Sequence, residues 1–298
     1  MRSGTTIEDG SGVGADELFG LFTDSGYLRG PHEAALTRVM DDVRRTFAAA
    51  YERRSDVFHS TVARQDGALV GHVSCVRVFE RTWMVQHLVS APSKHVAHLV
   101  ALRGADRLLE DPGCSFAKLW YQEHKSWPSE VFGGFARGET DGRRSDLRAF
   151  RRVSLDLDAE WPVRAGDCEA VEAGEAGVRL VADALAARVP PLLVEAEDLD
   201  AARLRLTDLG GAFAATRLHR SRGLLLAMRN GECLGFALAE RTSPGLNLQE
   251  LLSTFRLHVL PAGEALAERV RRALLGGVAR FYRSAGRPEA RGLIACDE

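Results

Sequence analysis

Apolar and polar residues alternate with a period of two along several stretches of the chain, and elsewhere apolar residues recur with a period of about 3.6. The first pattern predicts β-strands and the second predicts amphipathic helices. The expected strands are 59–65, 69–80, 83–89, 116–121, 147–155, 223–229, 233–240, 254–260 and 290–296. The expected helices are 33–51, 96–109, 176–187, 199–209 and 266–281.

One short segment of the chain occurs twice. The segment 63–71 (ARQDGALVG) returns as 227–235 (AMRNGECLG), with the alanine and both glycines in register, and Gly67 and Gly231 stand 164 residues apart. Asp66-Gly67 and Asn230-Gly231 are dipeptides that favour tight two-residue turns, because both positions tolerate positive φ angles. Each copy therefore predicts a hairpin, and the spacing is the size of one domain.

Around each hairpin the elements follow the same order of helix, strand, hairpin, strand, helix and strand. Trp161-Pro162 and a stretch rich in Gly, Ala and Glu interrupt the pattern at about 159–177. This break predicts two related domains, residues 1–158 and residues 159–298.

Composition places the chain among ordinary globular proteins. It has 298 residues, 45% hydrophobic and 27% charged, with a net charge of −2. The near-neutral charge argues against nucleic acid or an anionic membrane as partner. No apolar run is long enough for a membrane span and the start resembles no signal peptide, so we expect a cytoplasmic location. The five cysteines are widely spaced, which argues against a disulfide framework or a structural zinc site.

The repeated order of elements resembles the GNAT acyltransferase superfamily, twice in tandem. The resemblance implies an α/β (α+β) fold of two GNAT-like domains, each with a mixed, mostly antiparallel central sheet flanked by helices. In the first copy, 127–135 (WPSEVFGGF) is similar to the family's short helix, and strand 147–155 is expected to complete that sheet. The second copy is expected to be incomplete at its C-terminus: its last strands are lost or supplied by the other domain, or the chain continues in a longer protein, which we favour.

In this superfamily an acyl-CoA lies where the fourth and fifth strands separate, with its pyrophosphate on amides at the start of the next helix. Unpaired N–H groups and the helix dipole favour an anion there. The family's glycine-rich loop signature is missing from the first copy, and in the second copy Gly263 is followed by Glu264, which would repel a pyrophosphate. The resemblance assigns cofactor binding to Leu88, Val89, Ser90, Ser93, Lys94, His95 and Val96.

Catalysis in the family needs a general base and a group that protonates the leaving thiolate. His87 is the best-placed base, because an imidazole titrates near neutrality, and Glu80 and Tyr121 are further candidates. Guanidinium groups suit a carboxylate or phosphate. The candidates for substrate binding are Arg77, Arg81, Trp83, Glu123 and His124. Each of these residues is also compatible with a purely structural role, and no metal is expected.

Two functions stay open at this stage. The first is an acyl-CoA-dependent N-acyltransferase acting on a small amine or a protein amine, with acetyl-CoA or another acyl-CoA as cofactor. The second is a catalytically inactive GNAT-like module that binds a ligand or regulates, within a longer signalling protein. The missing glycines favour the second, whereas the resemblance favours the first.

Overall fold

The structure is a computed structural model that describes residues 4–28, 37, 39–91, 94–260, 263–287 and 289–296. The chain forms two compact units that interleave along the sequence. Unit 1 combines residues 1–121 with two later segments, 208–219 and 242–251. Unit 2 consists of residues 122–207, 220–241 and 252–298. Because interleaved units do not show where duplicated domains begin and end, the boundary between residues 158 and 159 stays a prediction.

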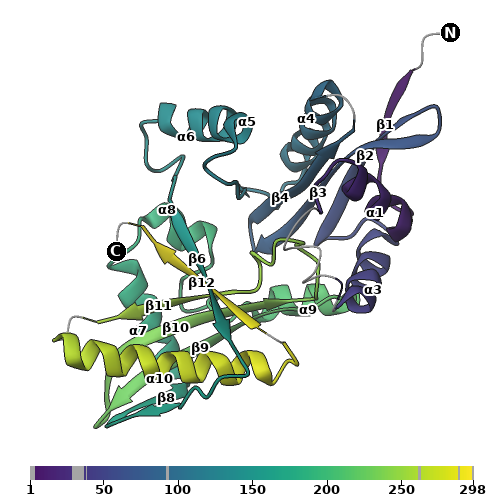
Figure 1. Ribbon diagram of the computed structural model, residues 1–298. Helices are drawn as coiled ribbons and strands as arrows, with labels where there is room; N and C mark the ends of the chain where they lie inside the picture. The colour runs from purple at the N-terminus through teal and green to yellow at the C-terminus, as the bar shows by residue number, and fades with distance from the viewer. Residues whose placement is uncertain are drawn as a thin grey trace. The chain divides into compact units, whose positions relative to one another are not determined.

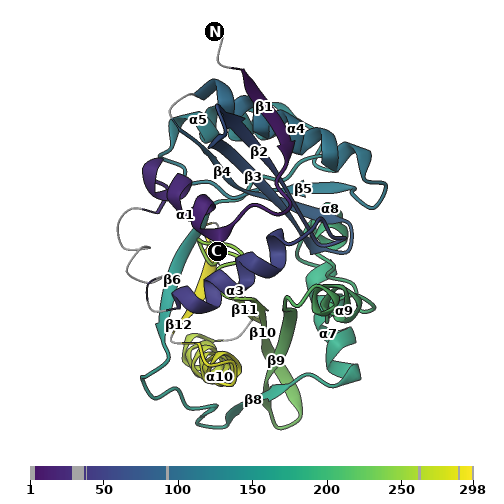
Figure 2. The same cartoon turned by 90° about the vertical axis from the view of Figure 1, so that its right-hand side faces the viewer.

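Unit 1 contains a five-stranded sheet in the order β1-β2-β3-β4-β5. Neighbouring strands are antiparallel except β4 and β5, which run parallel. One long helix packs on one face of the sheet, and two shorter helices contact β2, β3 and β4 (Figure 2). The strands are β1 (Thr5–Asp9), β2 (Phe58–Gln65), β3 (Ala68–Phe79), β4 (Thr82–Ser90) and β5 (Phe116–Lys118), and the helices are α1 (Ala15–Asp24), α3 (Met40–Tyr51) and α4 (Lys94–Glu110).

Unit 2 contains a seven-stranded sheet in the order β6-β12-β11-β10-β9-β8-β7 (Figure 1). Its strands are β6 (Phe150–Asp156), β7 (Arg164–Ala165), β8 (Cys168–Glu172), β9 (Arg220–Arg229), β10 (Glu232–Thr242), β11 (Thr254–Val259) and β12 (Glu289–Ala295). Its helices include α7 (Glu175–Ala186), α8 (Pro191–Ala196) and α10 (Glu264–Arg283), while α9 (Thr207–Ala215) lies almost entirely in unit 1. A helical segment of α5 (Ser126–Pro128), the π-helical turn η1 (Ser129–Gly133) and α6 (Gly134–Gly138) follows β5.

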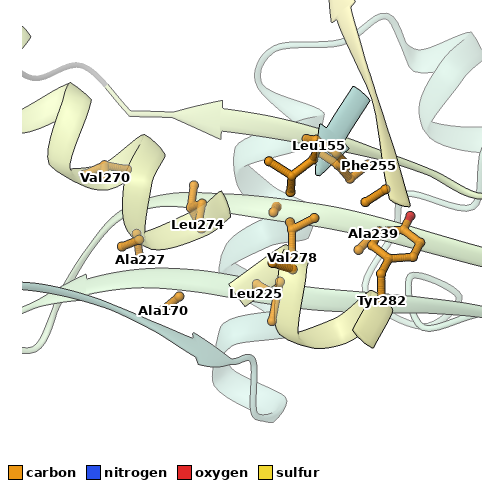
Figure 3. Close-up of a cluster of buried hydrophobic side chains, with 14 of the residues drawn as sticks. Leu155, Ala170, Leu225, Ala227, Ala239, Phe255, Val270, Leu274, Val278 and Tyr282 are labelled. Carbon is orange, nitrogen blue, oxygen red and sulfur yellow. The ribbon is translucent and has the colours of Figure 1, made fainter. Parts of the chain in front are cut away.

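The core of unit 2 lies between its sheet and α10 (Figure 3). Val270, Leu274 and Val278 recur along one side of this helix and are fully buried against the strands. Tyr282, in the last turn, is also buried and donates a hydrogen bond from its hydroxyl to the carbonyl of Glu240 at 2.6 Å. The apolar stripe thus fixes α10 across the sheet, as the 3.6-residue period predicts.

Both copies of the repeat form the predicted hairpins, β2–β3 and β9–β10. Asp66 and Gly67 have φ of 52° and 83°, and Asn230 and Gly231 have φ of 49° and 84°. Two successive positive φ angles define the turn whose twist suits a two-residue hairpin. The first glycine of each copy is therefore explained by the turn alone.

The second glycine of each copy, Gly71 or Gly235, allows a helix to approach the sheet. A Cβ at Gly71 would lie 2.5 Å from Val96 Cγ1 of α4. A Cβ at Gly235 would lie 2.8 Å from Val270 Cγ1 of α10 and 2.8 Å from the backbone oxygen of His258. The repeat is therefore explained by the hairpin turn and by the helix that packs on each sheet, and it does not mark a ligand site.

Three expectations from the sequence are wrong. The strand expected at 147–155 exists as β6 but pairs antiparallel along β12 in unit 2, so it does not complete the first sheet. The helix expected at 199–209 forms only from Thr207 onwards, as the start of α9; residues 201–205 form turns, and Leu206 has a φ of 55°, which a helix does not allow. The strand expected at 116–121 ends at Lys118. The first part of the helix expected at 33–51 lies outside the described residues.

Within the described part of the chain, no helix combines the length and the apolar character needed to cross a membrane.

Candidate functional site

Strands β4 and β5 separate in unit 1, as the resemblance predicts. They pair only through Thr82, Trp83 and Met84 of β4, opposite 116–118. From Val85 to Ser90, β4 continues along β3, and no strand in the described part of the chain pairs with its other edge. A strand edge of this kind presents backbone N–H and C=O groups to a ligand.

His87 lies on this part of β4, at a β-bulge. Ser74 of β3 is opposite Gln86 and His72 is opposite Val89, so two residues of β4 face one residue of β3. His87 has a φ of 52°, which is uncommon for a residue other than glycine. The bulge turns the His87 side chain into the interior, where only 3% of the residue is exposed.

The hydrogen bonds of His87 define its protonation. The backbone N–H of Leu248 donates to Nε2 at 3.1 Å, so the proton of the ring is on Nδ1, which donates to Ser74 Oγ at 3.2 Å. Burial, together with the neighbouring His72, places the pKa of His87 well below its usual value. The imidazole is therefore neutral, and both of its nitrogens are engaged.

A second imidazole, His72, continues this network. Its Nδ1 donates to the carbonyl of His87 at 2.9 Å, and its Nε2 accepts from the Tyr51 hydroxyl at 2.8 Å. Tyr51 also shares a hydrogen bond with Ser74. Burial lowers the pKa of His72 to about 4 and raises that of Tyr51. The network is closed and neutral, which is how buried polar groups avoid a desolvation penalty.

The segment Thr242–Leu251, which follows β10, covers His87 in unit 1. In addition to the Leu248 contact, Gln86 Nε2 donates to the carbonyl of Leu246 and Asn247 Nδ2 donates to Gln86 Oε1, both at 2.8 Å. Leu246 and Leu248 are each 2% exposed. Several backbone and side-chain contacts thus hold this segment, which we call the covering loop, over the bulge.

The other predicted residues of the β3–β4 hairpin do not join His87. Glu80 lies in the turn and pairs with Arg77, with its Oε1 3.0 Å from Arg77 Nη2. His87 is seven positions after Glu80 in an extended part of the chain, which corresponds to a span of up to about 23 Å. Arg81 donates to Ser115 Oγ at 3.0 and 2.6 Å, whereas Trp83 is buried and contacts the ring of His59. The hairpin therefore consists of a polar turn and a separate buried aromatic residue.

The residues assigned to cofactor binding lie at the end of β4 and the start of α4. Val89 is buried, Leu88 packs against the apolar cluster of Val96 and Val100 of α4, and Ser90 ends the strand. Lys94 begins α4, His95 is exposed and Val96 packs against Gly71. Ser93 lies outside the described residues. Of the candidates after β5, Glu123 and His124 are exposed in a turn and Tyr121 is half-buried before it.

Unit 2 holds a buried charge network that the sequence analysis missed. The side chains of Arg220 and Arg222 are fully buried and both bind Glu240, at 2.7 and 2.8 Å. Arg222 also donates to the carbonyl of Glu197, whose carboxylate pairs with Arg256 at 2.8 Å. Burial alone would raise the pKa of Glu240, but the surrounding arginines lower it to about 2. A signal was in the sequence, since Arg220 and Arg222 stand two positions apart and therefore share one face of β9.

No predicted site residue lines either of two cavities that described residues form. One, of about 270 Å³, lies in unit 1 between the ends of α3 and α9. The other, of about 80 Å³, lies in unit 2 where β11 and β12 diverge. Among the described residues, no group of three or more His, Cys, Asp or Glu side chains could hold a metal ion.

The chain has a tandem GNAT-like fold. It is similar to a solved tandem GNAT protein from the clavulanic acid biosynthesis pathway, with 14% identity and a TM-score of 0.52, over 99% of this chain and 91% of that one. It is also similar to a GCN5-related N-acetyltransferase from Sphaerobacter thermophilus, with 12% identity and a TM-score of 0.50, over 97% of this chain and 87% of that one. No protein-family model and no curated protein matches the sequence.

Proposed function

We propose that the protein is an acyl-CoA-dependent N-acyltransferase acting on a small amine or a protein amine, with the acyl-CoA bound in unit 1. The observation that carries the proposal is the separation of β4 from β5 after Met84, in a GNAT-like fold. The pantetheine arm of CoA contains amide groups, which can pair with the open edge of β4 as an added strand would. The pyrophosphate would then lie at the start of α4, near Lys94.

In this proposal, His87 removes the proton from the attacking amine through Nε2. That atom now accepts the hydrogen bond of the Leu248 N–H, so the covering loop must move away before Nε2 can reach a substrate. Burial keeps the imidazole neutral but lowers its pKa and therefore its strength as a base, so the same movement of the covering loop must expose His87 to solvent before it can accept a proton. Acyl transfer thus requires an opening step at residues 242–251.

Isothermal titration with acetyl-CoA tests the proposal. We expect saturable binding, and we expect Lys94→Glu to weaken it at least tenfold through repulsion of the phosphates. Ala265→Glu is the matched control, because it adds a negative charge to the first turn of α10 in unit 2 and should leave the affinity unchanged. Absence of binding at millimolar acetyl-CoA would refute the proposal.

The second function, a ligand-binding module without catalysis, is favoured by one specific observation. Both nitrogens of His87 are hydrogen-bonded under the covering loop, and the residue is 3% exposed. Release of free CoA thiol, measured over a panel of primary amines, separates the two functions. Acetyl-CoA binding without thiol release for any amine would support the module and exclude the transferase.

A further inference from the structure

The cavity of unit 2 is lined by both apolar and charged residues. It lies between β11 and β12, which pair only at Thr254 and Phe255 and then separate. One part of its lining is aliphatic, with Leu185 and Leu193 from the helices α7 and α8. The polar and charged part of the lining consists of Arg148, Arg188, Glu197, Arg256 and His258.

The charges around the cavity are not balanced within it. Glu197 is the carboxylate of the lining, and it is paired with Arg256 at 2.8 Å. Arg148 pairs with Asp146, outside the lining, at 3.0 Å. Arg188 donates to the carbonyl of Val259 at 3.4 Å, and no carboxylate in the described part of the chain lies within ion-pair distance of it. The cavity therefore carries an excess of positive charge.

His258 adds a polar atom without a partner. Its ring stacks on Phe236, with the ring centroids 4.7 Å apart, and its Nε2 is buried without a hydrogen bond to any residue that the structure describes. A buried polar atom in this state is unfavourable by about 1–3 kcal/mol unless another group satisfies it. Burial and then Arg256 and Arg188 lower the pKa of His258 to about 4, so the ring is neutral and can donate one N–H.

We propose that this cavity binds a small organic carboxylate with an aliphatic body, held by Arg188, Arg148 and the Nε2 of His258. The carboxylate supplies the missing negative charge, and its oxygens accept from the guanidinium groups and the imidazole N–H. The aliphatic body lies against Leu185 and Leu193. Because a water needs about 10–15 Å³ of cavity, the space of about 80 Å³ holds about five to eight non-hydrogen atoms.

The buried charge network contacts the polar residues on this face of the sheet. Leu238 is paired across the strands with Arg256, and Phe236 with His258, so the two polar residues lie on one face of β11. Glu197 fixes Arg256 from one side and is itself held through its carbonyl by the fully buried Arg222. A binding group whose neighbours are fixed in this way loses little conformational freedom when a ligand arrives.

Sodium butyrate is a suitable probe, and ligand-observed NMR with isothermal titration measures its binding to the full chain. We expect a dissociation constant on the order of 1 mM, as suits a ligand of six non-hydrogen atoms. Butanol and butylammonium have the same body without the negative charge and should bind at least tenfold more weakly. Inorganic phosphate has the charge without the body and should also be weaker. Equal binding of any of these three probes would overturn the proposal.

Substitutions inside and outside the cavity lining test whether butyrate binds in this cavity. Arg188→Gln removes an exposed cation of the lining and should weaken butyrate about tenfold, since a hydrogen bond to a charged group contributes roughly 1.5–3 kcal/mol. Arg179→Gln, an exposed arginine of α7 outside the lining, is the matched control and should bind as the parent does. Leu193→Trp should fill the cavity and abolish binding while thermal unfolding shows a folded protein. Undiminished affinity in Arg188→Gln and Leu193→Trp would place butyrate elsewhere and overturn the proposal.

This inference does not depend on acyl transfer in unit 1. The acetyl-CoA titration responds to Lys94→Glu, whereas the butyrate titration responds to Arg188→Gln. If acetyl-CoA does not bind, butyrate binding can still be measured, and the reverse also holds.

Discussion

Removal of the Glu240 charge is expected to destabilise the protein strongly. Glu240→Gln keeps the size of the side chain but leaves the buried guanidinium groups of Arg220 and Arg222 without their counter-charge. Breaking one partner of a buried ion pair destabilises a protein by roughly 3–5 kcal/mol. The pKa of Glu240 leads to a similar value, because lowering it from 4.5 to about 2 corresponds to about 3 kcal/mol.

Urea titrations followed by circular dichroism measure this loss at pH 7. The matched control is Glu268→Gln on α10, whose carboxylate is about half exposed and pairs with Arg272 at 3.0 Å. A surface pair of this kind contributes under about 1 kcal/mol. A loss in Glu240→Gln no larger than in Glu268→Gln would refute the assignment of Glu240 as the counter-charge of a buried network.

The pH dependence gives an independent check on Glu240. Its pKa is lower in the folded protein than in the unfolded chain, so its contribution is fully present above about pH 4.5 and is lost as the pH falls towards 2. The difference in the free energy of unfolding between the parent and Glu240→Gln should therefore shrink over that interval. A difference that is independent of pH between 4.5 and 2 contradicts the argument.

Three further predictions concern burial in unit 1 and the cysteines. Burial lowers the pKa of His72 to about 4, so as the pH falls the unfolded chain takes up a proton on this histidine before the folded protein does. About 3 kcal/mol of the free energy of unfolding should therefore be lost between pH 6.5 and 4. Urea midpoints that do not change over this range would contradict the prediction. Cys296 is exposed and should react with a thiol reagent in the native protein, whereas Cys75, buried and with a pKa raised to about 12, should react only after unfolding. Gly71→Ala should destabilise by about 1–3 kcal/mol through its clash with α4, while Gly20→Ala, in a helix with open space around it, should be neutral or stabilising in the same thermal melts.

The hairpins could be predicted because their signals are local. Asp66-Gly67 and Asn230-Gly231 determine the turn by their own backbone preferences, whatever the rest of the chain does. The long helices α4 and α10 were predicted for the same reason, since each carries its own apolar stripe. The strand predicted at 147–155 forms as β6, but its partner β12 lies far away in the sequence, and strand periodicity does not identify a partner.

The candidate site was harder to predict. His87 was a candidate base from the sequence, but neither its burial nor the covering loop has a signal in the sequence. Asn247 and Leu248 reach Gln86 and His87 from about 160 positions further along, through contacts that only the folded chain defines. The catalytic and cofactor roles of the sequence-predicted residues stay predictions that the acetyl-CoA titrations will test.

The pairing of β6 with β12 has a consequence for synthesis of the protein on the ribosome. Asp156 and Glu289 pair across about 130 residues of sequence, so β6 leaves the ribosome long before the strand that covers it. Contacts of such separation form slowly, because a long stretch of chain must first be ordered. During translation β6 is therefore an uncovered strand edge, the kind of surface on which nascent chains aggregate or recruit chaperones.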